Sequence, residues 1–135
     1  MHIPIRVGLS PTLKIRGLLA DADIRQGQIL ERCPVILVDI QQEEALHQTV
    51  LKRYYYEWNA RHHAVVLGYG SLYNHSHAPN VRYGFGYRNE QLVFTALRNI
   101  AAGEELFVNY NGSGSEASDP VAGHFVDHDP HRRRK

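Results

Sequence analysis

The sequence predicts a mainly β protein with a minor helical part, and three observations support this. Apolar residues alternate with polar or small ones over 3–9, which is the period-two pattern of a half-buried strand. Further short apolar segments follow, bounded by glycine, proline or asparagine, as is typical of strands joined by turns. Only 41–52 has the composition of a helix, since it combines Ala45, Leu46 and several Gln and Glu residues.

The first half of the chain divides into short elements. After the first strand, 14–20 is predicted to be a second one, and Gly17 inside it indicates a bulge or a close approach of the backbone to another group. Gly27 stands between apolar flanks in 24–30, which predicts a hairpin turn. Residues 35–40 are apolar and β-branched enough for a buried strand.

The second half continues the strand pattern. Five more strands are expected, at 54–58, 64–67, 81–85, 92–97 and 106–108. The third and fourth of these flank a glycine-containing turn and are predicted to form a hairpin. Gly103 stands between apolar flanks with the spacing seen around Gly27, so it predicts another hairpin turn.

Length and composition bound the class of protein. At 135 residues the chain can form one hydrophobic core and is too short for two. Its apolar fraction of 43% and charged fraction of 21% are ordinary for a soluble globular protein. No apolar run is long enough to span a membrane and no export leader follows Met1, so the cytoplasm is the expected location. The single cysteine, Cys33, excludes an internal disulfide and a multi-cysteine zinc cluster within this chain.

The C-terminal segment differs in character from the rest. Residues 112–120 have the composition of a flexible Gly/Ser linker, and the remainder is rich in His, Asp and Arg. We therefore expect a folded domain at 1–111 and a flexible tail at 112–135. Four of the 15 basic residues stand at 132–135, so the net charge of +1 hides an acidic balance elsewhere. A short basic end more often solvates a tail than binds nucleic acid.

The stretch 68–80 has an unusual density of turn formers and polar side chains. Its Asn and His side chains offer both donors and acceptors, and Pro79 forces the preceding Ala78 into an extended conformation. Such a loop can present a fixed pattern of partners to a polar ligand. It can equally be a well-capped surface turn, and composition alone leaves both readings open.

Two motifs in order decide between these readings. The first is Asn-His-Ser-x-x-Pro-Asn at 74–80, and the second is Gly-Glu-Glu-Leu-Phe-Val-Asn-Tyr at 103–110. With Arg16-Gly17-Leu18 upstream, they resemble the signature motifs of SET-domain protein-lysine methyltransferases. The resemblance covers about 13–111 and is closest to minimal stand-alone bacterial and viral members. It implies the SET (β-clip) fold, with several short sheets, a minor helical part and a knot-like C-terminal segment.

The resemblance implies a protein-lysine N-methyltransferase that transfers a methyl group from S-adenosylmethionine to a lysine side chain of a protein substrate. Tyr110 matches the catalytic tyrosine of the second motif, which also contacts the cofactor. Tyr83, three residues past Asn80, matches an aromatic of the lysine channel, and its hydroxyl would favour monomethylation. The other cofactor-binding positions of the family match Arg16, Gly17, Asn74 and His75, and the positions that hold the loop match Ser76, Pro79 and Asn80.

The chain departs from the family pattern at two positions. Ile15 stands where a glycine is usual, two residues before Gly17, and His77 stands where cysteine is common. Many larger relatives close the channel with a cysteine-rich zinc segment, which is absent here, so no resident metal is expected. The aromatic run 54–58 offers further channel residues, although such runs more often pack in a core.

The resemblance also indicates the partners. A lysine-containing protein substrate, histone-like or otherwise basic, is expected; a membrane and nucleic acid are not, and a homodimer stays open. Two alternatives to the enzyme remain. One is a SET-fold peptide-binding module in which methyl transfer has lapsed. The other is a small metal-responsive or nucleic-acid-associated protein that uses its His-rich basic tail.

Overall fold

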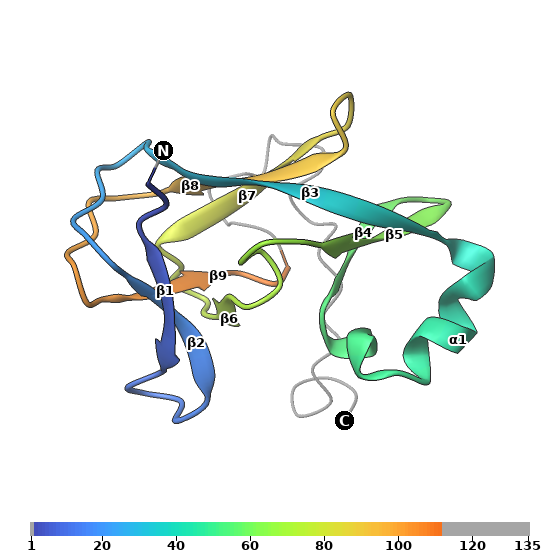
Figure 1. The fold of residues 1–135 in the computed structure, drawn as a ribbon, viewed down its shortest axis with the longest axis horizontal. Coiled ribbons are helices and arrows are strands. Elements are labelled where there is room, and N and C mark those ends of the chain that lie inside the picture. Colours follow the sequence, from blue (N-terminus) through green and yellow to red (C-terminus); the bar gives the residue numbers. More distant parts are fainter. Residues whose placement is uncertain (1, 112–135) are drawn as a thin grey trace.

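The computed structural model describes residues 2–111, and their strands form two sheets (Figure 1). The four-stranded sheet has the order β1-β2-β9-β6, with β1 (Ile5–Leu9), β2 (Arg16–Ala20), β6 (Asn74–His75) and β9 (Glu105–Val108). The five-stranded sheet has the order β4-β5-β3-β8-β7, with β3 (Ile29–Asp39), β4 (Tyr55–Asn59), β5 (His62–Val66), β7 (Val81–Gly86) and β8 (Gln91–Ala96). The mainly β class is confirmed. Residues 112–135, predicted to be a flexible tail, lie outside the described residues.

The helical part is more broken than the sequence predicted. In place of one helix over 41–52, the chain forms the 3-10 turn η1 (Ile40–Gln42), the helix α1 (Glu43–His47) and the 3-10 turn η2 (Val50–Arg53). Thr49 causes the break, because its backbone is extended and its Oγ1 accepts a hydrogen bond from the N–H of Leu51 at 3.1 Å. In the described part of the chain, every helix is too short to cross a membrane.

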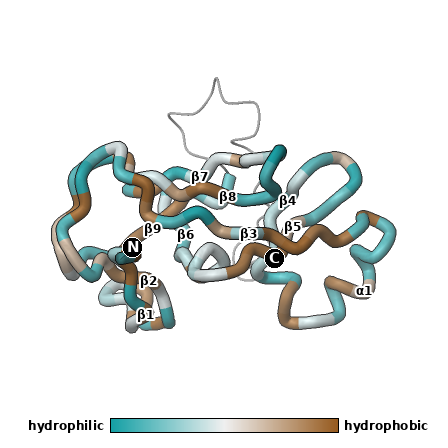
Figure 2. The backbone as a smooth tube through the Cα atoms, turned by 45° about the horizontal axis from the view of Figure 1, so that its top comes forward, coloured by the Kyte–Doolittle hydropathy of each residue, from teal (hydrophilic) through white to brown (hydrophobic). Residues whose placement is uncertain are grey.

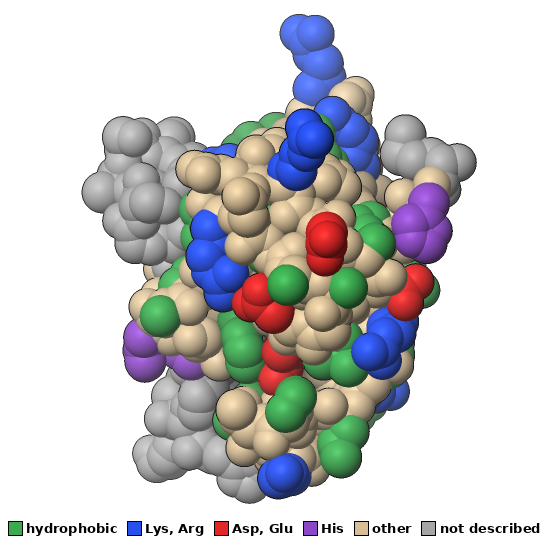
Figure 3. All heavy atoms as spheres, turned by 90° about the vertical axis from the view of Figure 1, so that its left-hand side faces the viewer, with side chains coloured by type: hydrophobic (Ala, Val, Ile, Leu, Met, Phe, Trp, Pro, Cys, Tyr) green, Lys and Arg blue, Asp and Glu red, His purple; other side chains and the backbone are tan. Residues whose placement is uncertain are grey.

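The first strand forms where expected but is less buried than its alternation predicted. Ile5 is 4% exposed, whereas Val7 and Leu9 are 45% and 63% exposed. β1 lies at the edge of its sheet and pairs only with β2, so backbone pairing holds it. Figure 3 shows the face of the molecule on this side, where hydrophobic side chains are scattered among charged ones.

The two glycine turns do not close hairpins, which corrects the expectation for 24–30 and its counterpart around Gly103. Ile24 and Ile100 instead pair with each other through two backbone hydrogen bonds of 2.8 Å. Gly27 and Gly103 have φ angles of 85° and 92°, a left-handed conformation that favours glycine. The turn at Gly27 therefore leads into β3, and the turn at Gly103 leads into β9.

One hydrophobic core joins the two sheets. Figure 2 shows hydrophobic residues concentrated in the strands at the middle of the molecule and hydrophilic ones in the outer loops. β9 lies between β2, to which it is antiparallel, and β6, to which it is parallel. The predicted hairpin of β7 and β8 is confirmed. The side chains with no exposed surface include Leu18, Cys33, Leu92, Phe94, Leu106 and Val108.

Candidate active site

The two sequence motifs meet where β6 runs beside β9. Asn74 lies opposite Phe107 and His75 opposite Val108 in this parallel pair. Tyr110 stands two residues after Val108, and its backbone N–H donates to Nδ1 of His75 at 3.0 Å. The two rings lie 5.0 Å apart between centroids. The structure thus brings Tyr110 against the Asn74–His75 segment, as a shared site requires.

The Tyr110 phenol is held by a backbone carbonyl. Its hydroxyl donates to the carbonyl oxygen of Tyr73 at 2.9 Å, which fixes the direction of the side chain. A phenol oxygen that donates its proton still has lone pairs with which to accept. Two oxygen atoms, one phenolic and one from the backbone, therefore lie together at this point of the site.

Tyr83 lies behind Tyr110 in the core. It is 1% exposed, and its hydroxyl is 3.5 Å from the carbonyl oxygen of Tyr110, at the limit of hydrogen bonding. Its ring meets the edge of Tyr56 at a centroid distance of 5.2 Å. The hydroxyl of Tyr56 donates to the carbonyl of Gly70 at 2.8 Å. Tyr83 therefore lies next to Tyr110, with Tyr56 beside it.

Tyr56 and Tyr73 were not singled out from the sequence. The aromatic run at 54–58 was noted, but only the strand geometry shows that Tyr56 points toward Tyr83. Tyr73 contributes its carbonyl, and a backbone atom leaves no signal in a motif. Its ring stacks on Phe94 at 4.5 Å.

Both of these tyrosines are in a dry environment. Burial raises the pKa of the Tyr56 hydroxyl well above its ordinary value of 10.0, with the neighbouring Tyr83 adding to the effect. Burial likewise raises the pKa of Tyr73, whose hydroxyl has no hydrogen-bond partner within residues 2–111. Burial therefore keeps these two phenols, which form part of the inner wall of the site, in their neutral form.

Asn74 is held by two partners through one nitrogen. Its Nδ2 donates to the backbone oxygen of Arg16 at 3.2 Å and to Oε2 of Glu105 at 2.8 Å. Glu105 is 7% exposed, and its other carboxylate oxygen accepts from the hydroxyl of Ser10. With the amide oriented this way, Oδ1 of Asn74 has no partner among the described residues, so a hydrogen-bond acceptor is left over for a ligand.

Gly17 makes room for this network. A Cβ at Gly17 would lie 2.5 Å from Nδ2 of Asn74 and 2.7 Å from Oε2 of Glu105. The close approach predicted at Gly17 is therefore made to these two side chains. Arg16 joins the site through its carbonyl, while the residue itself is exposed.

The remaining loop residues fix the shape of the segment. Asn80 is 2% exposed and bonds β9 twice, donating to the Glu105 carbonyl and accepting from the Phe107 N–H, each at 2.8 Å. Since Nδ1 of His75 accepts from a backbone N–H, the neutral ring carries its proton on Nε2 and donates it to Nε2 of His77 at 3.3 Å. Asn80 thus holds the loop as predicted, and His77 contacts the His75 ring.

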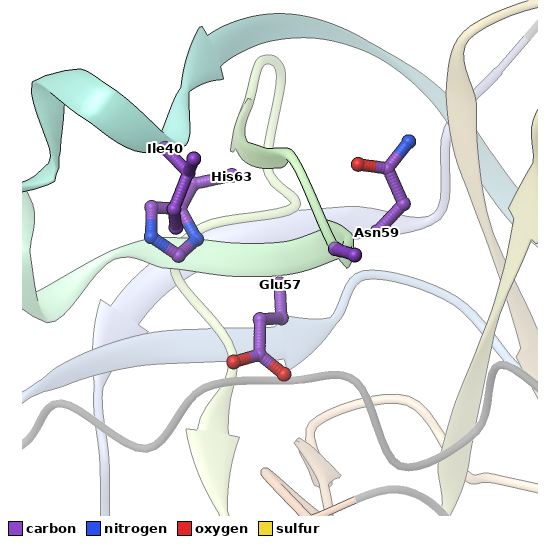
Figure 4. A pocket seen from close by; sticks show the side chains of 5 residues that line it. Ile40, Glu57, Asn59 and His63 are labelled. Atoms are coloured by element: carbon purple, nitrogen blue, oxygen red, sulfur yellow. The ribbon is translucent and has the colours of Figure 1, made fainter.

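The surface has one pocket beside the motifs and another away from them. One, of about 320 Å³, opens beside the motifs and is lined by residues that include Ser76, Asn80 and Phe107. The other, of about 380 Å³, lies at the β4–β5 hairpin, where Figure 4 shows Glu57 and Asn59 pointing in different directions. In residues 2–111 no group of three His, Cys, Asp or Glu side chains is placed to hold a metal ion.

Comparison with known proteins agrees with this geometry. The family model for the SET domain matches residues 15–111. The chain belongs to the SET-domain family. A Schizosaccharomyces pombe histone-lysine N-methyltransferase specific for H3 lysine-37 is 35% identical over 98 residues, which cover 72% of this SET protein and 67% of the relative.

Solved structures confirm the SET fold. A Plasmodium falciparum protein assigned as a histone methyltransferase superposes with a TM-score of 0.63 at 28% identity, over 81% of this chain and 98% of that one. A chain of the Chaetomium thermophilum Polycomb repressive complex 2, bound to S-adenosylmethionine, has a TM-score of 0.67 at 24% identity. The match covers 82% of this chain but 15% of that one, so it supports the fold alone.

Proposed function

We propose that this SET domain is a protein-lysine N-methyltransferase that uses S-adenosylmethionine. The observation that carries the proposal is the meeting of the Tyr110 phenol, the Tyr73 carbonyl and the Asn74–His75 segment at one point. The alternative, a peptide-binding module without methyl transfer, shares the fold but does not explain why the Tyr110 phenol and the Tyr73 carbonyl lie together.

The residues present fit the cofactor. The uncommitted Oδ1 of Asn74 is an acceptor suited to the ammonium of the methionine part. The phenol oxygen of Tyr110 and the carbonyl of Tyr73 suit a methyl group that carries partial positive charge. Arg16, Gly17 and His75 would complete the cofactor-binding set from the positions that they hold around Asn74.

The chain's own residues would do the rest of the work. When bound, S-adenosylmethionine supplies a methyl group on a sulfonium for in-line displacement by a neutral amine. Tyr110 would orient the two reacting atoms, and its oxygen would stabilise the positive charge that passes with the methyl group from the sulfur to the lysine nitrogen. The buried Tyr56, Tyr83 and Phe94 exclude water from the inner wall. A lysine amine in such a place has a lowered pKa, because burial disfavours its charged form, and so arrives deprotonated.

The substrate class follows from the relatives by analogy. The Schizosaccharomyces pombe relative is specific for a lysine of histone H3, and histone tails are lysine-rich and basic. We therefore propose a histone-like or other basic protein as the first substrate to test. The Tyr83 hydroxyl, close to the Tyr110 carbonyl, would limit the room for further methyl groups and favour monomethylation.

The test measures cofactor binding by titration calorimetry and transfer of a labelled methyl group to mixed histones, using the full chain. Tyr110→Phe should lower kcat by about 100-fold or more, because a positioned oxygen is lost from the transition state. Tyr87→Phe, a 42% exposed tyrosine of the β7–β8 turn, is the control. Unimpaired turnover by Tyr110→Phe would overturn the assignment, and peptide binding without transfer by the wild type would favour the binding module.

A further inference from the structure

The loop 68–73, which lies between β5 and β6, positions the hydroxyls of Tyr56 and Tyr110. Its Gly70 carbonyl receives the hydrogen bond from Tyr56 at 2.8 Å, and its Tyr73 carbonyl receives the one from Tyr110 at 2.9 Å. A movement of this backbone would carry both acceptors with it. The direction of the two phenols therefore depends on what holds the loop.

A carboxylate from the five-stranded sheet holds the loop at its start. Glu31 of β3 accepts from the backbone N–H of Tyr69 through both oxygens, at 3.2 and 3.4 Å. A Cβ at Gly68 would lie 2.3 Å from Oε2 of the same carboxylate. Gly68 also has a φ of 69°, which favours glycine. The loop therefore passes so close to Glu31 that no side chain fits between them.

Neighbouring contacts continue this attachment along the loop. Cys33, two residues further along β3, is fully buried, and a Cβ at Gly70 would lie 3.1 Å from its Sγ. Ser71 donates to the Val66 carbonyl at 2.8 Å. These contacts tie down the middle of the loop, whereas Glu31 holds its start through the backbone N–H of Tyr69.

We propose that Glu31 is a positioning residue for methyl transfer: its carboxylate fixes the loop 68–73 so that Gly70 and Tyr73 present their carbonyls to Tyr56 and Tyr110. The inference rests on the proposed function and names a residue outside both SET motifs. Glu31 acts through the loop and through Tyr110, so its removal should affect the rate of transfer more than the binding of cofactor or substrate.

The experiment compares Glu31→Ala, Glu31→Gln and Glu31→Asp in the full chain, with exposed Glu44→Ala in α1 as the matched control. Glu31→Ala should lower kcat by about 10- to 100-fold, as small misplacements in active sites do, while KM and the cofactor Kd stay within about 2-fold. Gln keeps an acceptor oxygen at the same reach and should restore most of the rate. Asp is one methylene shorter and should not.

Two further readouts separate positioning from general stability. In a Tyr110→Phe background, Glu31→Ala should have little additional effect on kcat, because the two changes act through one phenol. Amide hydrogen exchange at Tyr69 should be faster in Glu31→Ala and near wild type in Glu31→Gln.

Each outcome decides for or against the inference. An unchanged kcat in Glu31→Ala, equal losses in the Ala and Gln variants, or unchanged exchange at Tyr69 would overturn the role of Glu31. A wild-type chain that transfers no methyl group would instead overturn the proposed function, and the exchange measurement would still test whether Glu31 holds the loop.

Discussion

The five-stranded sheet and the four-stranded sheet hold their shapes by different means. In the larger sheet, β3 runs for 11 residues between β5 and β8, and the buried Leu92 and Phe94 of β8 pack in the core. In the smaller sheet, β6 is 2 residues long and β9 is 4, so backbone pairing is brief. Side-chain hydrogen bonds supplement this short backbone pairing. Asn74 donates to the Glu105 carboxylate, and Asn80 donates to the Glu105 backbone carbonyl.

This difference shows why the motif residues lie where they do. The larger sheet is a scaffold stabilised by apolar burial, which many side chains can provide. The smaller sheet needs particular donors and acceptors, because each buried polar group must find its partner. The same residues therefore fold the site and serve it. Substitutions in the two sheets should fail for different reasons.

The largest effect is expected in the scaffold. Phe94→Ala removes a fully buried ring that stacks on Tyr73, and should lower the free energy of unfolding by about 3–5 kcal/mol. Val93→Ala, on the half-buried opposite face of β8, should cost less than about 1.5 kcal/mol. Urea denaturation monitored by fluorescence checks both values. Equal losses would show that this face of β8 does not carry the core.

A polar substitution at a side chain that bonds β9 of the smaller sheet should cost nearly as much. Asn80→Ala leaves the Glu105 carbonyl and the Phe107 N–H without their partner, and should lower stability by about 2–4 kcal/mol. Asn99→Ala is the control, because its exposed hydrogen bond to the Gln26 N–H should cost about 1 kcal/mol or less. Equal losses of stability in the two variants would show that burial does not set the strength of the Asn80 hydrogen bonds.

Two glycines sharpen the comparison between the sheets. Gly17→Ala forces a Cβ into Asn74 and Glu105, and should lower stability by about 1–3 kcal/mol and weaken cofactor binding. A Cβ at Gly84 in β7 meets only Arg82, at 3.8 Å, so Gly84→Ala should be nearly neutral in both assays. Thermal unfolding and titration calorimetry supply the measurements. A neutral Gly17→Ala would mean that the Asn74 network can shift without loss.

Alkaline pH should destabilise the folded state through the buried Tyr56 and Tyr73. The folded state raises the pKa of Tyr56 and Tyr73 above 10.0, so above that pH the unfolded chain releases protons that the folded chain keeps. The free energy of unfolding should then fall as pH rises, by up to about 1.4 kcal/mol per pH unit for each tyrosine. Tyr56→Phe should make the fall shallower. Parallel curves for the variant and the wild type would contradict this account.

The smallest effect on stability is expected from the loss of the Tyr83 hydroxyl. Tyr83→Phe removes the hydroxyl that donates to the Tyr110 carbonyl at 3.5 Å, and the loss of so long a hydrogen bond should cost less than about 1 kcal/mol of stability. The extra room should shift the product from monomethylated toward dimethylated lysine, which mass spectrometry of a methylated peptide resolves. An unchanged product ratio would remove the idea that Tyr83 limits methylation.

Local patterns predicted much of the larger sheet. Alternation and a turn were enough for the β7–β8 hairpin, because its strands are neighbours in the chain and each reports its own burial. The same patterns failed around Gly27 and Gly103. The segments before these two glycines pair with each other, through Ile24 and Ile100, although they are far apart in the sequence. They also missed β6, since two residues are too few to show a period.

The sequence by itself determined the family, because the motif residues and their order are written in the chain, and it named Tyr110, Tyr83, Asn74 and His75 as a group. Only the tertiary structure decided how they connect. The Tyr73 carbonyl accepts from Tyr110, and the buried Glu105 carboxylate accepts from Asn74. Glu31, which is far from the loop 68–73 in the sequence, accepts from its backbone. The physical reason is that hydrogen bonds depend on where atoms lie after folding, and backbone atoms carry no residue-specific signal.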